Sequence, residues 1–202
     1  MKALLDAWAL DPFGTAVSLV VAGCVVSVLV SVLLNFLSAQ RGVQKQEEKS
    51  IVVTSTMLAF FLVYYAVLRL GVGVVPVARA LEMILLVLGV GLIVLGTVVN
   101  IWGRASLGGN WADKVTLYEN QTLVTAGPFK MVRHPLYASL IWMFVGGAFF
   151  LHNGLALLLT LAVFLPFMTY RARQEERLLS GRYPEYARYR GEVGMLFPKV
   201  RR

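Results

Sequence analysis

The 202-residue sequence has little of the material from which several common classes of site are built. One cysteine and two histidines exclude a disulfide framework and provide few ligands, so we expect no metal site. Charged residues make up only 15% of the chain, against about 25% in a typical soluble domain. A phosphate-binding loop, a dinucleotide-binding fingerprint and a G-x-S-x-G nucleophile motif are also absent from the sequence. The chain is therefore not an ordinary soluble enzyme built on one of these motifs.

Long apolar runs are abundant, because 58% of the residues are hydrophobic. A helix that crosses a bilayer needs about 20 mostly apolar residues. Five runs meet or approach this length, at 13–37, 51–68, 84–102, 135–151 and 155–170. Only three residues separate the last two runs, which predicts a tight helical hairpin. We therefore expect an all-α, polytopic integral membrane protein with five transmembrane helices, the last two forming a hairpin.

The basic residues indicate how such a protein is oriented. With five spans, sixteen Lys and Arg residues fall on one side of the membrane and three on the other. The basic side comprises 38–50, 103–134 and 171–202, which together carry the entire net charge of +8. Cytoplasmic loops of membrane proteins are enriched in Lys and Arg. We expect a multi-pass protein of the cell inner membrane with a cytoplasmic C-terminus, membrane lipids as neighbours and no nucleic-acid partner.

The polar segments divide the chain into two functional parts. Residues 1–102 supply three transmembrane helices with short loops, and residues 103–202 supply a loop, the hairpin and a C-terminal helical segment. Because both large polar segments lie on the cytoplasmic side and the hairpin joins them, a site is expected where they meet. Within the C-terminal segment, Tyr183, Tyr186 and Tyr189 predict a short amphipathic helix with its aromatic face at the headgroup level. Pro166 predicts a kink in the last span.

One stretch before the hairpin concentrates residues that carry chemistry. Gly127-Pro128 is typical of a turn, and Arg133-His134-Pro135 places a cation and an imidazole at the start of a membrane helix. The unpaired backbone N–H groups at such a helix start attract a carboxylate or another anion. A purely structural interpretation is also open, in which Arg133 binds a lipid phosphate and Tyr137 lies at the membrane interface. Composition alone does not separate the two.

The same stretch resembles a family signature. Residues 127–137 (GPFKMVRHPLY) resemble the G-P-Y-x-x-x-R-H-P-x-Y signature of the isoprenylcysteine carboxyl methyltransferase family and its phospholipid N-methyltransferase relatives. Residues 175–179 (EERLL), followed by 183–186 (YPEY) and Tyr189, resemble the E-E-x-x-L and Y-x-x-Y elements of the family tail. Residues 107–111 (LGGNW) resemble its L-G-x-N-[WF] element. The resemblance covers roughly residues 100–200, although Phe129 stands where the family usually has tyrosine.

This resemblance implies a membrane methyltransferase that uses S-adenosylmethionine, with the cofactor between the cytoplasmic loop, the hairpin base and the C-terminal segment. By position, it implies catalytic roles for Arg171, Arg133 and Glu175, with Arg171 facing the polar group of the substrate. It implies that the cofactor is bound by Gln121, Thr122, Leu123, Val124, Gly127, Phe129, His134, Pro135, Tyr137, Glu175 and Glu176.

The reaction class leaves the methyl acceptor open. The expected substrate is a lipophilic small molecule or a lipid, most like the carboxylate of an isoprenylcysteine; a phospholipid amine and a small thiol are alternatives. A carboxylate acceptor needs no general base, whereas an amine or thiol must lose a proton, for which Glu175, Glu176 and His134 are candidates. A small non-catalytic transporter or subunit is a further alternative, disfavoured because the span interiors carry no charge. Monomer and homodimer are both open.

Overall fold

A computed structural model of the chain describes residues 12–38, 44–47, 51–108, 116–118 and 122–199. The long helices are α2 (Pro12–Ser38), α3 (Ile51–Leu70), α4 (Arg79–Leu107) and α5 (Pro135–Phe150). A last long rod consists of α6 (Gly154–Leu159), the π-helical segment η3 (Thr160–Phe164) and α7 (Leu165–Arg182). Shorter elements are strands β1 (Gln44–Glu47) and β2 (Thr116–Tyr118), the 3₁₀ helix η2 (Gly127–Lys130) and α8 (Tyr186–Glu192).

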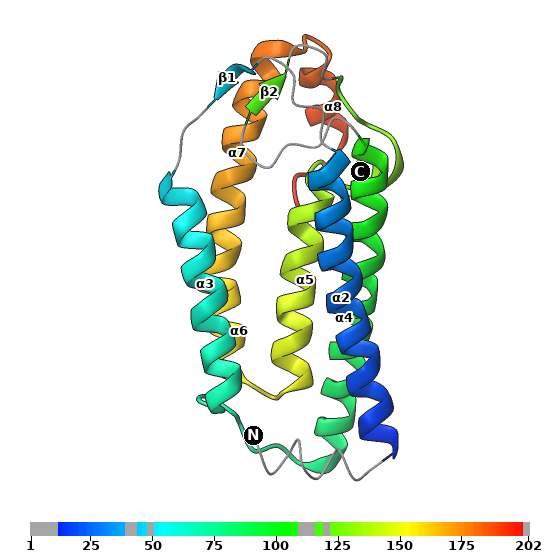
Figure 1. Ribbon diagram of the computed structural model, residues 1–202, viewed down its shortest axis with the longest axis vertical. Coiled ribbons are helices and arrows are strands. Elements are labelled where there is room, and N and C mark those ends of the chain that lie inside the picture. The colour runs from blue at the N-terminus through cyan, green and yellow to red at the C-terminus, as the bar shows by residue number, and fades with distance from the viewer. Residues whose placement is uncertain (1–11, 39–43, 48–50, 109–115, 119–121, 200–202) are drawn as a thin grey trace.

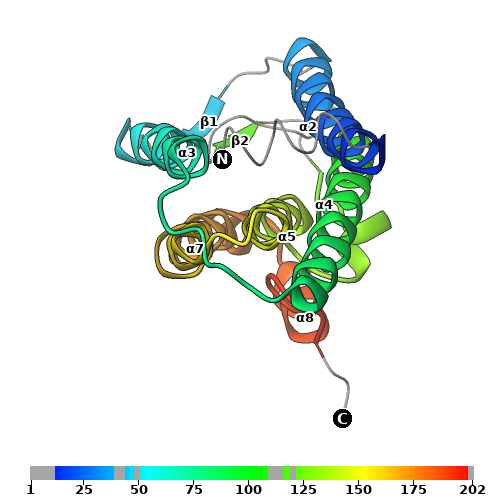
Figure 2. The same ribbon diagram turned by 90° about the horizontal axis from the view of Figure 1, so that it is seen from below.

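The long helices lie side by side along one axis, and successive helices run in opposite directions (Figure 1). Seen along that axis, α5 lies between α4 and the rod that ends in α7, with α2 and α3 further out (Figure 2). The strands and α8 lie at one end of the bundle, and the α5–α6 and α3–α4 connections lie at the other (Figure 1). The described parts of the three basic segments therefore gather at the same end, as the charge distribution predicts.

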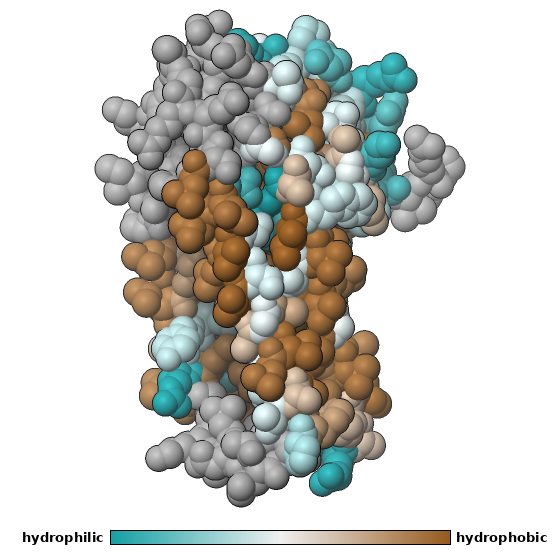
Figure 3. Space-filling view, turned by 45° about the vertical axis from the view of Figure 1, so that its right-hand side comes forward, coloured by the Kyte–Doolittle hydropathy of each residue, from teal (hydrophilic) through white to brown (hydrophobic). Residues whose placement is uncertain are grey.

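The helices have the character of membrane helices. Three, at Pro12–Asn35, Arg79–Leu107 and Gly154–Arg182, are long and apolar enough to cross a membrane. Two further apolar helices, Thr56–Leu70 and Pro135–Phe150, are shorter than that criterion. Hydrophobic side chains cover much of the middle of the molecule, and hydrophilic ones gather toward its ends (Figure 3). The helical membrane-protein fold is confirmed to this extent, and the count of five spans stays a prediction.

A small antiparallel sheet adds to the helical fold. Strand β1 pairs with β2, with Gln44 opposite Tyr118 and Glu47 opposite Thr116. Short polar strands of this kind have no periodic apolar pattern, so the all-α expectation did not include them. Their pairing joins the first basic segment to the second, on the side of α7 where the last basic segment begins.

Helices α4 and α5 pack closely against each other, and glycines make the approach possible. A Cβ atom on Gly89 would lie 2.7 Å from the carbonyl oxygen of Gly146, and one on Gly96 would lie 2.8 Å from that of Ser139. Small residues allow this approach between membrane helices. Gly89 and Gly96 therefore lie at the helix contact. Gly91 does not, because among the described residues no atom outside its own stretch of helix lies within 4 Å of the position that its Cβ would take.

A buried polar chain also joins α4 to α5. The Asn100 Nδ2 atom donates to Ser139 Oγ at 2.8 Å, and Arg104 Nε donates to Asn100 Oδ1 at 2.8 Å. Asn100 and Ser139 are fully buried. A hydrogen bond between buried side chains is favoured because each group would otherwise be unsatisfied in an apolar setting. This chain holds the start of α5, which carries the candidate site, in register with the end of α4.

The last rod contains a local irregularity close to the predicted kink. Pro166 has no N–H to donate, so the α-helical ladder is interrupted before it. The Leu165 N–H instead reaches the carbonyl of Thr160, five residues back, and Thr160–Phe164 takes the π form. The irregularity is a π turn that precedes the proline, and it directs Phe164 into the core, where its side chain is fully buried.

The predicted hairpin tip is confirmed between Phe150 and Gly154. Asn153 caps α6, because its Oδ1 accepts from the Ala156 N–H at 2.8 Å. Its Nδ2 donates to the carbonyl of Val72 at 2.9 Å, which fastens the tip to the α3–α4 connection.

Candidate cofactor and acceptor site

The site is built where the chain passes from η2 into α5. Pro135 occupies the first turn of α5, where its missing N–H costs nothing, and His134 is the residue before it. The backbone here is held by the C-terminal segment: Arg133 N–H donates to the carbonyl of Gly194 at 2.8 Å, and His134 N–H donates to that of Met195 at 3.0 Å. The two segments thus form a short parallel bridge that fixes the direction of both side chains.

The Arg133 side chain is committed to the protein itself. Its Nε and Nη2 atoms lie 2.8 and 2.7 Å from Glu176 Oε1, and its Nη1 donates to the carbonyls of Arg190 and Val193. Only 7% of the Arg133 side chain and 4% of the Glu176 side chain are exposed. Arg133 therefore ties α7 to the segment after α8, and it has few donors left for the anion that the sequence assigned to it.

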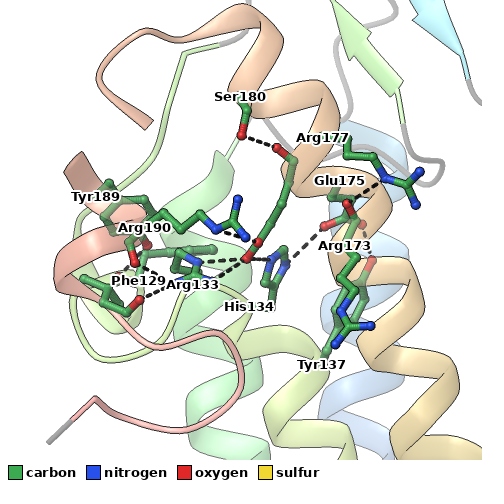
Figure 4. A network of polar contacts seen from close by, with 12 residues as sticks. Phe129, Arg133, His134, Tyr137, Arg173, Glu175, Arg177, Ser180, Tyr189 and Arg190 are labelled. Atoms are coloured by element: carbon green, nitrogen blue, oxygen red, sulfur yellow. Dashed lines mark hydrogen bonds and ion pairs between the residues drawn. The ribbon is translucent and has the colours of Figure 1, made fainter. Parts of the chain in front are cut away.

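His134 lies between two carboxylates of α7 (Figure 4). Its Nε2 is 3.3 Å from Glu176 Oε1 and its Nδ1 is 3.3 Å from Glu175 Oε2. Burial by itself would lower the pKa of His134, but hydrogen bonds and charge from Glu175 and Glu176 outweigh it and hold the pKa above its ordinary value. A protonated imidazole donates from both nitrogens, which suits a position between two acceptors.

Glu175 is the more open of the two carboxylates, with 29% of its side chain exposed. It accepts a hydrogen bond from the Tyr137 hydroxyl. The Tyr137 ring lies parallel to the His134 ring, with centroids 5.6 Å apart. The Arg171 guanidinium carbon lies 5.7 Å from the centroid of the same Tyr137 ring. A partly open carboxylate, an imidazole, a phenol and a guanidinium therefore meet between α5 and α7.

Two polar atoms beside this group have no partner in the described part of the chain. They are the Nε of Arg171 and the Oε1 of Gln174, both buried. The Arg171 Nη1 atom contacts Met57 Sδ of α3 at 3.5 Å, which is a weak acceptor. A buried donor or acceptor without a partner is costly. A donor and an acceptor three residues apart on α7 are suited to the polar group of a ligand.

The other predicted cofactor residues differ in where the structure places them. Phe129 is buried, and its carbonyl accepts from the Tyr189 hydroxyl at 2.6 Å. Gly127 has φ +60°, and a Cβ atom there would meet the side chains of Ser106 and Trp102 of α4, so glycine is needed where η2 begins. Thr122, Leu123 and Val124 lead into η2 without regular secondary structure, and Gln121 lies outside the described residues.

The structure corrects the expectation for the aromatic residues of the tail and adds contributors that the sequence did not single out. Tyr186, which begins α8, is 1% exposed, and Tyr189 bonds the η2 backbone, so both turn toward the protein and not toward lipid headgroups. Arg190 lies 3.7 Å from Glu176 Oε2. The three-residue spacing of the tyrosines revealed the helix, but not which way it faces.

Comparison with known proteins places this site in a family context. Residues 87–181 match the family model described as "Isoprenylcysteine carboxyl methyltransferase (ICMT) family". Among solved structures, the chain is similar to a eukaryotic intramembrane Ras methyltransferase ICMT, with a TM-score of 0.53 and 21% identity. That match covers 76% of this chain and 54% of the other. At this identity the likeness concerns the fold.

Two curated bacterial proteins are similar in sequence. The cobalt-zinc-cadmium resistance protein CzcN of Cupriavidus metallidurans is 34% identical over 120 residues, which is 58% of this chain and 50% of that protein. The nickel-cobalt-cadmium resistance protein NccN of Alcaligenes xylosoxydans xylosoxydans is 32% identical over 117 residues, covering 57% and 51%. The chain therefore spans about half the length of these curated relatives in the matched region.

Proposed function

We propose that this chain, which matches the isoprenylcysteine carboxyl methyltransferase family over residues 87–181, is a membrane enzyme that methylates a lipophilic acceptor with S-adenosylmethionine. The reaction most like it is carboxyl O-methylation of an isoprenylcysteine. One observation carries the proposal: Glu175, His134, Tyr137 and Arg171 meet between α5 and α7 at the basic end of an apolar helical bundle.

The groups around Glu175 fit the methyl donor. S-adenosylmethionine supplies an activated methyl group on a positively charged sulfur, together with an amino group and a carboxylate. Glu175 offers a partly open carboxylate to the positive groups, and the parallel rings of His134 and Tyr137 lie beside it. The backbone of 122–124 and the ring of Phe129 are proposed to complete the cofactor site. Glu176 and Arg133 are proposed to act indirectly, because their pairing holds His134 in place.

The side chains that could accept a proton are already engaged, which favours a carboxylate acceptor over an amine or a thiol. Both ring nitrogens of His134 face carboxylate oxygens at 3.3 Å, and despite its burial the charge of Glu175 and Glu176 raises its pKa, so the ring is poorly placed to take a proton from an acceptor. Glu176 is engaged by Arg133. A carboxylate acceptor needs no general base. The Nε of Arg171 is a buried donor without a partner among the described residues, and it could orient the carboxylate. The protein then contributes positioning and exclusion of water.

We propose that the bundle crosses the inner membrane five times, with this site and the C-terminus in the cytoplasm. The two helices below the length criterion, Thr56–Leu70 and Pro135–Phe150, run alongside the three longer ones and connect the same two ends of the bundle. The basic segments mark the cytoplasmic end by the enrichment of Lys and Arg in cytoplasmic loops. A reporter enzyme fused after the last residue should be active only on the cytoplasmic side; activity in the periplasm would refute this topology.

The names of the two curated relatives suggest a setting in metal resistance, and we propose the same methyl transfer as this chain's contribution to it. Within the described ranges, no three His, Cys, Asp or Glu side chains group in a way that could hold a metal ion. Complementation of a metal-sensitive deletion strain by wild type but not by Glu175→Ala would support this setting. Equal complementation by both would separate metal resistance from the methyl-transfer site.

The decisive experiment is binding of the cofactor to purified protein in detergent, measured by calorimetry. Wild type should bind S-adenosylmethionine and its demethylated product, and Glu175→Ala should weaken binding at least about tenfold, because a charged hydrogen bond is lost. Glu192→Ala is the matched control, since Glu192 pairs only with exposed Arg188 on α8 in the described contacts. Absence of binding by wild type in several detergents would overturn the enzyme proposal.

The acceptor class can be read from the stability of the product. Membranes containing the protein are incubated with donor labelled in the methyl group, and the lipid extract is treated with base. A methyl ester releases labelled methanol, whereas an N-methyl or S-methyl product retains the label. Release of label supports the carboxylate acceptor, and retention would transfer the assignment to an amine or thiol.

A further inference from the structure

The interface between α3, α5 and the last rod, called the seam here, is polar near Arg171 and aromatic further along the bundle toward the hairpin tip. On α5, Tyr137 and Phe144 are seven residues apart and therefore share a face. On the last rod, Arg171 and Phe164 are also seven residues apart. At the helical rise per residue, both pairs are separated by about 10 Å along the bundle. The same seam thus begins at the polar site and reaches Phe144 and Phe164 at one common depth.

At that depth four phenylalanines form an aromatic layer, defined here as Phe60, Phe61, Phe144 and Phe164. The Phe164 ring is stacked on Phe60 with centroids 4.6 Å apart, and it meets Phe144 edge-on at 4.7 Å. Phe60 meets Phe144 edge-on at 5.2 Å, and Phe61 stacks on Phe144 at 5.7 Å. Because each ring contacts at least two others, none can turn aside without displacing a neighbour.

Two further contacts hold this layer in place. The Tyr64 hydroxyl of α3 donates to the carbonyl of Phe144 at 2.6 Å, across to α5. The π turn η3 ends at Phe164 and carries its ring to the interior, where it is fully buried. The aromatic layer is therefore anchored to the backbone of two different helices, and it closes the seam rigidly.

Between the polar site and the aromatic layer the seam is lined by adaptable side chains. Met57 of α3 touches Arg171, and Met168 of α7 lies one turn below Arg171 and is fully buried. Both belong to the same apolar cluster as the phenylalanines. Methionine is unbranched and flexible, so it can yield to an inserted apolar group more easily than a stacked ring. Met57 and Met168 are therefore the side chains in this part of the seam that an inserted apolar group would displace most easily.

We propose that the aromatic layer sets the length of the acceptor: the polar group binds at Arg171, the apolar chain displaces Met57 and Met168, and the chain ends at Phe164. The protein then selects lipophilic acceptors of short chain over long ones. This proposal rests on the proposed function, because it takes the acceptor to be bound at Arg171. The competing interpretation is that the phenylalanines only pack α3 onto the bundle.

The test compares straight-chain carboxylates of increasing length: butanoate, octanoate and hexadecanoate. Octanoate has an extended chain close to the depth of the aromatic layer. Wild type should prefer octanoate over hexadecanoate in kcat/KM for methyl transfer. Phe164→Ala removes the end wall and leaves an apolar cavity, so the hexadecanoate-to-octanoate ratio of kcat/KM should rise about tenfold or more. Ile93→Ala is the matched control, because Ile93 is a buried residue of the α4–α5 contact, away from the seam.

A second variant moves the limit in the opposite direction. Met168→Phe replaces a flexible side chain with a ring of similar size at the methionine level. Octanoate should then lose its advantage over butanoate by about tenfold, and folding should be retained because the added volume is only about that of one methylene group. The two variants together distinguish a length limit from a general loss of activity, since they shift the preferred length in opposite directions.

Binding of the same carboxylates is measured in parallel by calorimetry in the presence of the demethylated cofactor product. If methyl transfer occurs but neither variant changes the preferred length, the aromatic layer is only a packing core and this inference is wrong. If no carboxylate is methylated but the binding preference shifts with Phe164→Ala, the inference stands and the proposed chemistry fails. A shift of the same size in Ile93→Ala would also overturn the inference.

Discussion

The two ends of α5 each carry a buried histidine, and they are the only histidines in the chain. His134 precedes the helix and is 6% exposed; His152 follows it and is 9% exposed. His134 has a carboxylate at each ring nitrogen. At His152, by contrast, the Nε2 atom is buried without a partner in the described part of the chain, and the backbone adopts φ 49°.

Similar burial therefore accompanies different roles. At the hairpin tip the backbone is what matters, because the His152 carbonyl accepts from Val75 N–H at 2.8 Å and Asn153 caps the next helix. At the basic end the side chains matter, because Arg133 and Glu176 form a buried ion pair and His134 Nε2 lies 3.3 Å from the same Glu176 oxygen. Burial of a polar residue alone is thus a poor guide to function, and the charges around it decide.

The largest expected effect is that of removing Glu176, which joins the buried side chains at the basic end of the bundle. Glu176→Ala leaves the buried Arg133 guanidinium and the His134 ring without their shared carboxylate. Removing one partner of a buried ion pair costs about 3–5 kcal/mol, because the other charge stays buried and unpaired. We expect a loss of this size in the free energy of unfolding in detergent, followed by tryptophan fluorescence, and the loss of cofactor binding.

Glu192→Ala serves as the control for that experiment. Its partner Arg188 is almost fully exposed, so this ion pair contributes little to stability. A loss for Glu176→Ala no larger than the loss for Glu192→Ala would show that the buried network does not hold the site together.

Asn153→Ala tests the hairpin tip, which lies at the opposite end of α5 from the candidate site. The substitution removes the helix cap on Ala156 N–H and the hydrogen bond to the Val72 carbonyl. We expect the free energy of unfolding to fall by about 1–2 kcal/mol. Cofactor affinity should be unchanged, because the hairpin tip lies at the opposite end of α5. A drop in cofactor affinity without loss of stability would break the distinction between the two ends.

The smallest expected effect is a difference between the two histidines in how they contribute to the pH dependence of stability. The pKa of His134 is raised in the folded state, so the folded protein binds this proton more tightly than the unfolded chain does. The resulting stabilisation is fully present below the ordinary histidine pKa of about 6.5 and is lost as pH rises through the folded pKa. Melting temperature should therefore decline over that range in wild type.

The matched variants make this prediction specific. His134→Asn should flatten the decline in melting temperature, while His152→Asn should retain it, because asparagine tolerates the positive φ at the tip. Equal slopes in His134→Asn and wild type would mean that another group is responsible for the pH dependence.

Much of the fold was predictable because it depends on properties that are local in sequence. The apolar runs, the three-residue hairpin tip and the role of Pro135 follow from hydrophobicity and from backbone chemistry at single positions. The β1–β2 pair was not predictable, since its short polar segments are far apart in the chain and carry no periodic pattern. The π turn was only partly foreseen: Pro166 indicates that the helix is disturbed, but packing decides how the backbone adapts.

The candidate site shows the same division. The resemblance to the family signature drew attention to His134, Tyr137 and Glu175, and the structure brings these three together. The resemblance implied a catalytic role for both Arg133 and Arg171, and the residues alone do not show that one of the two is engaged by the protein itself. Only the contacts show that Arg133 is bound to Glu176 and that Arg171 retains a buried donor without a partner in the described residues.

By itself, the sequence determined that this is an apolar helical protein whose net positive charge falls in three segments, with a stretch before its hairpin that resembles a methyltransferase signature. These are properties of hydrophobicity, charge and residue order, which act along the chain. The tertiary structure decided which carboxylate is open, which arginine keeps a donor for a ligand and where the phenylalanines close the seam. Those features depend on contacts between residues up to about a hundred positions apart, as between Phe60 and Phe164, and they exist only once the helices pack.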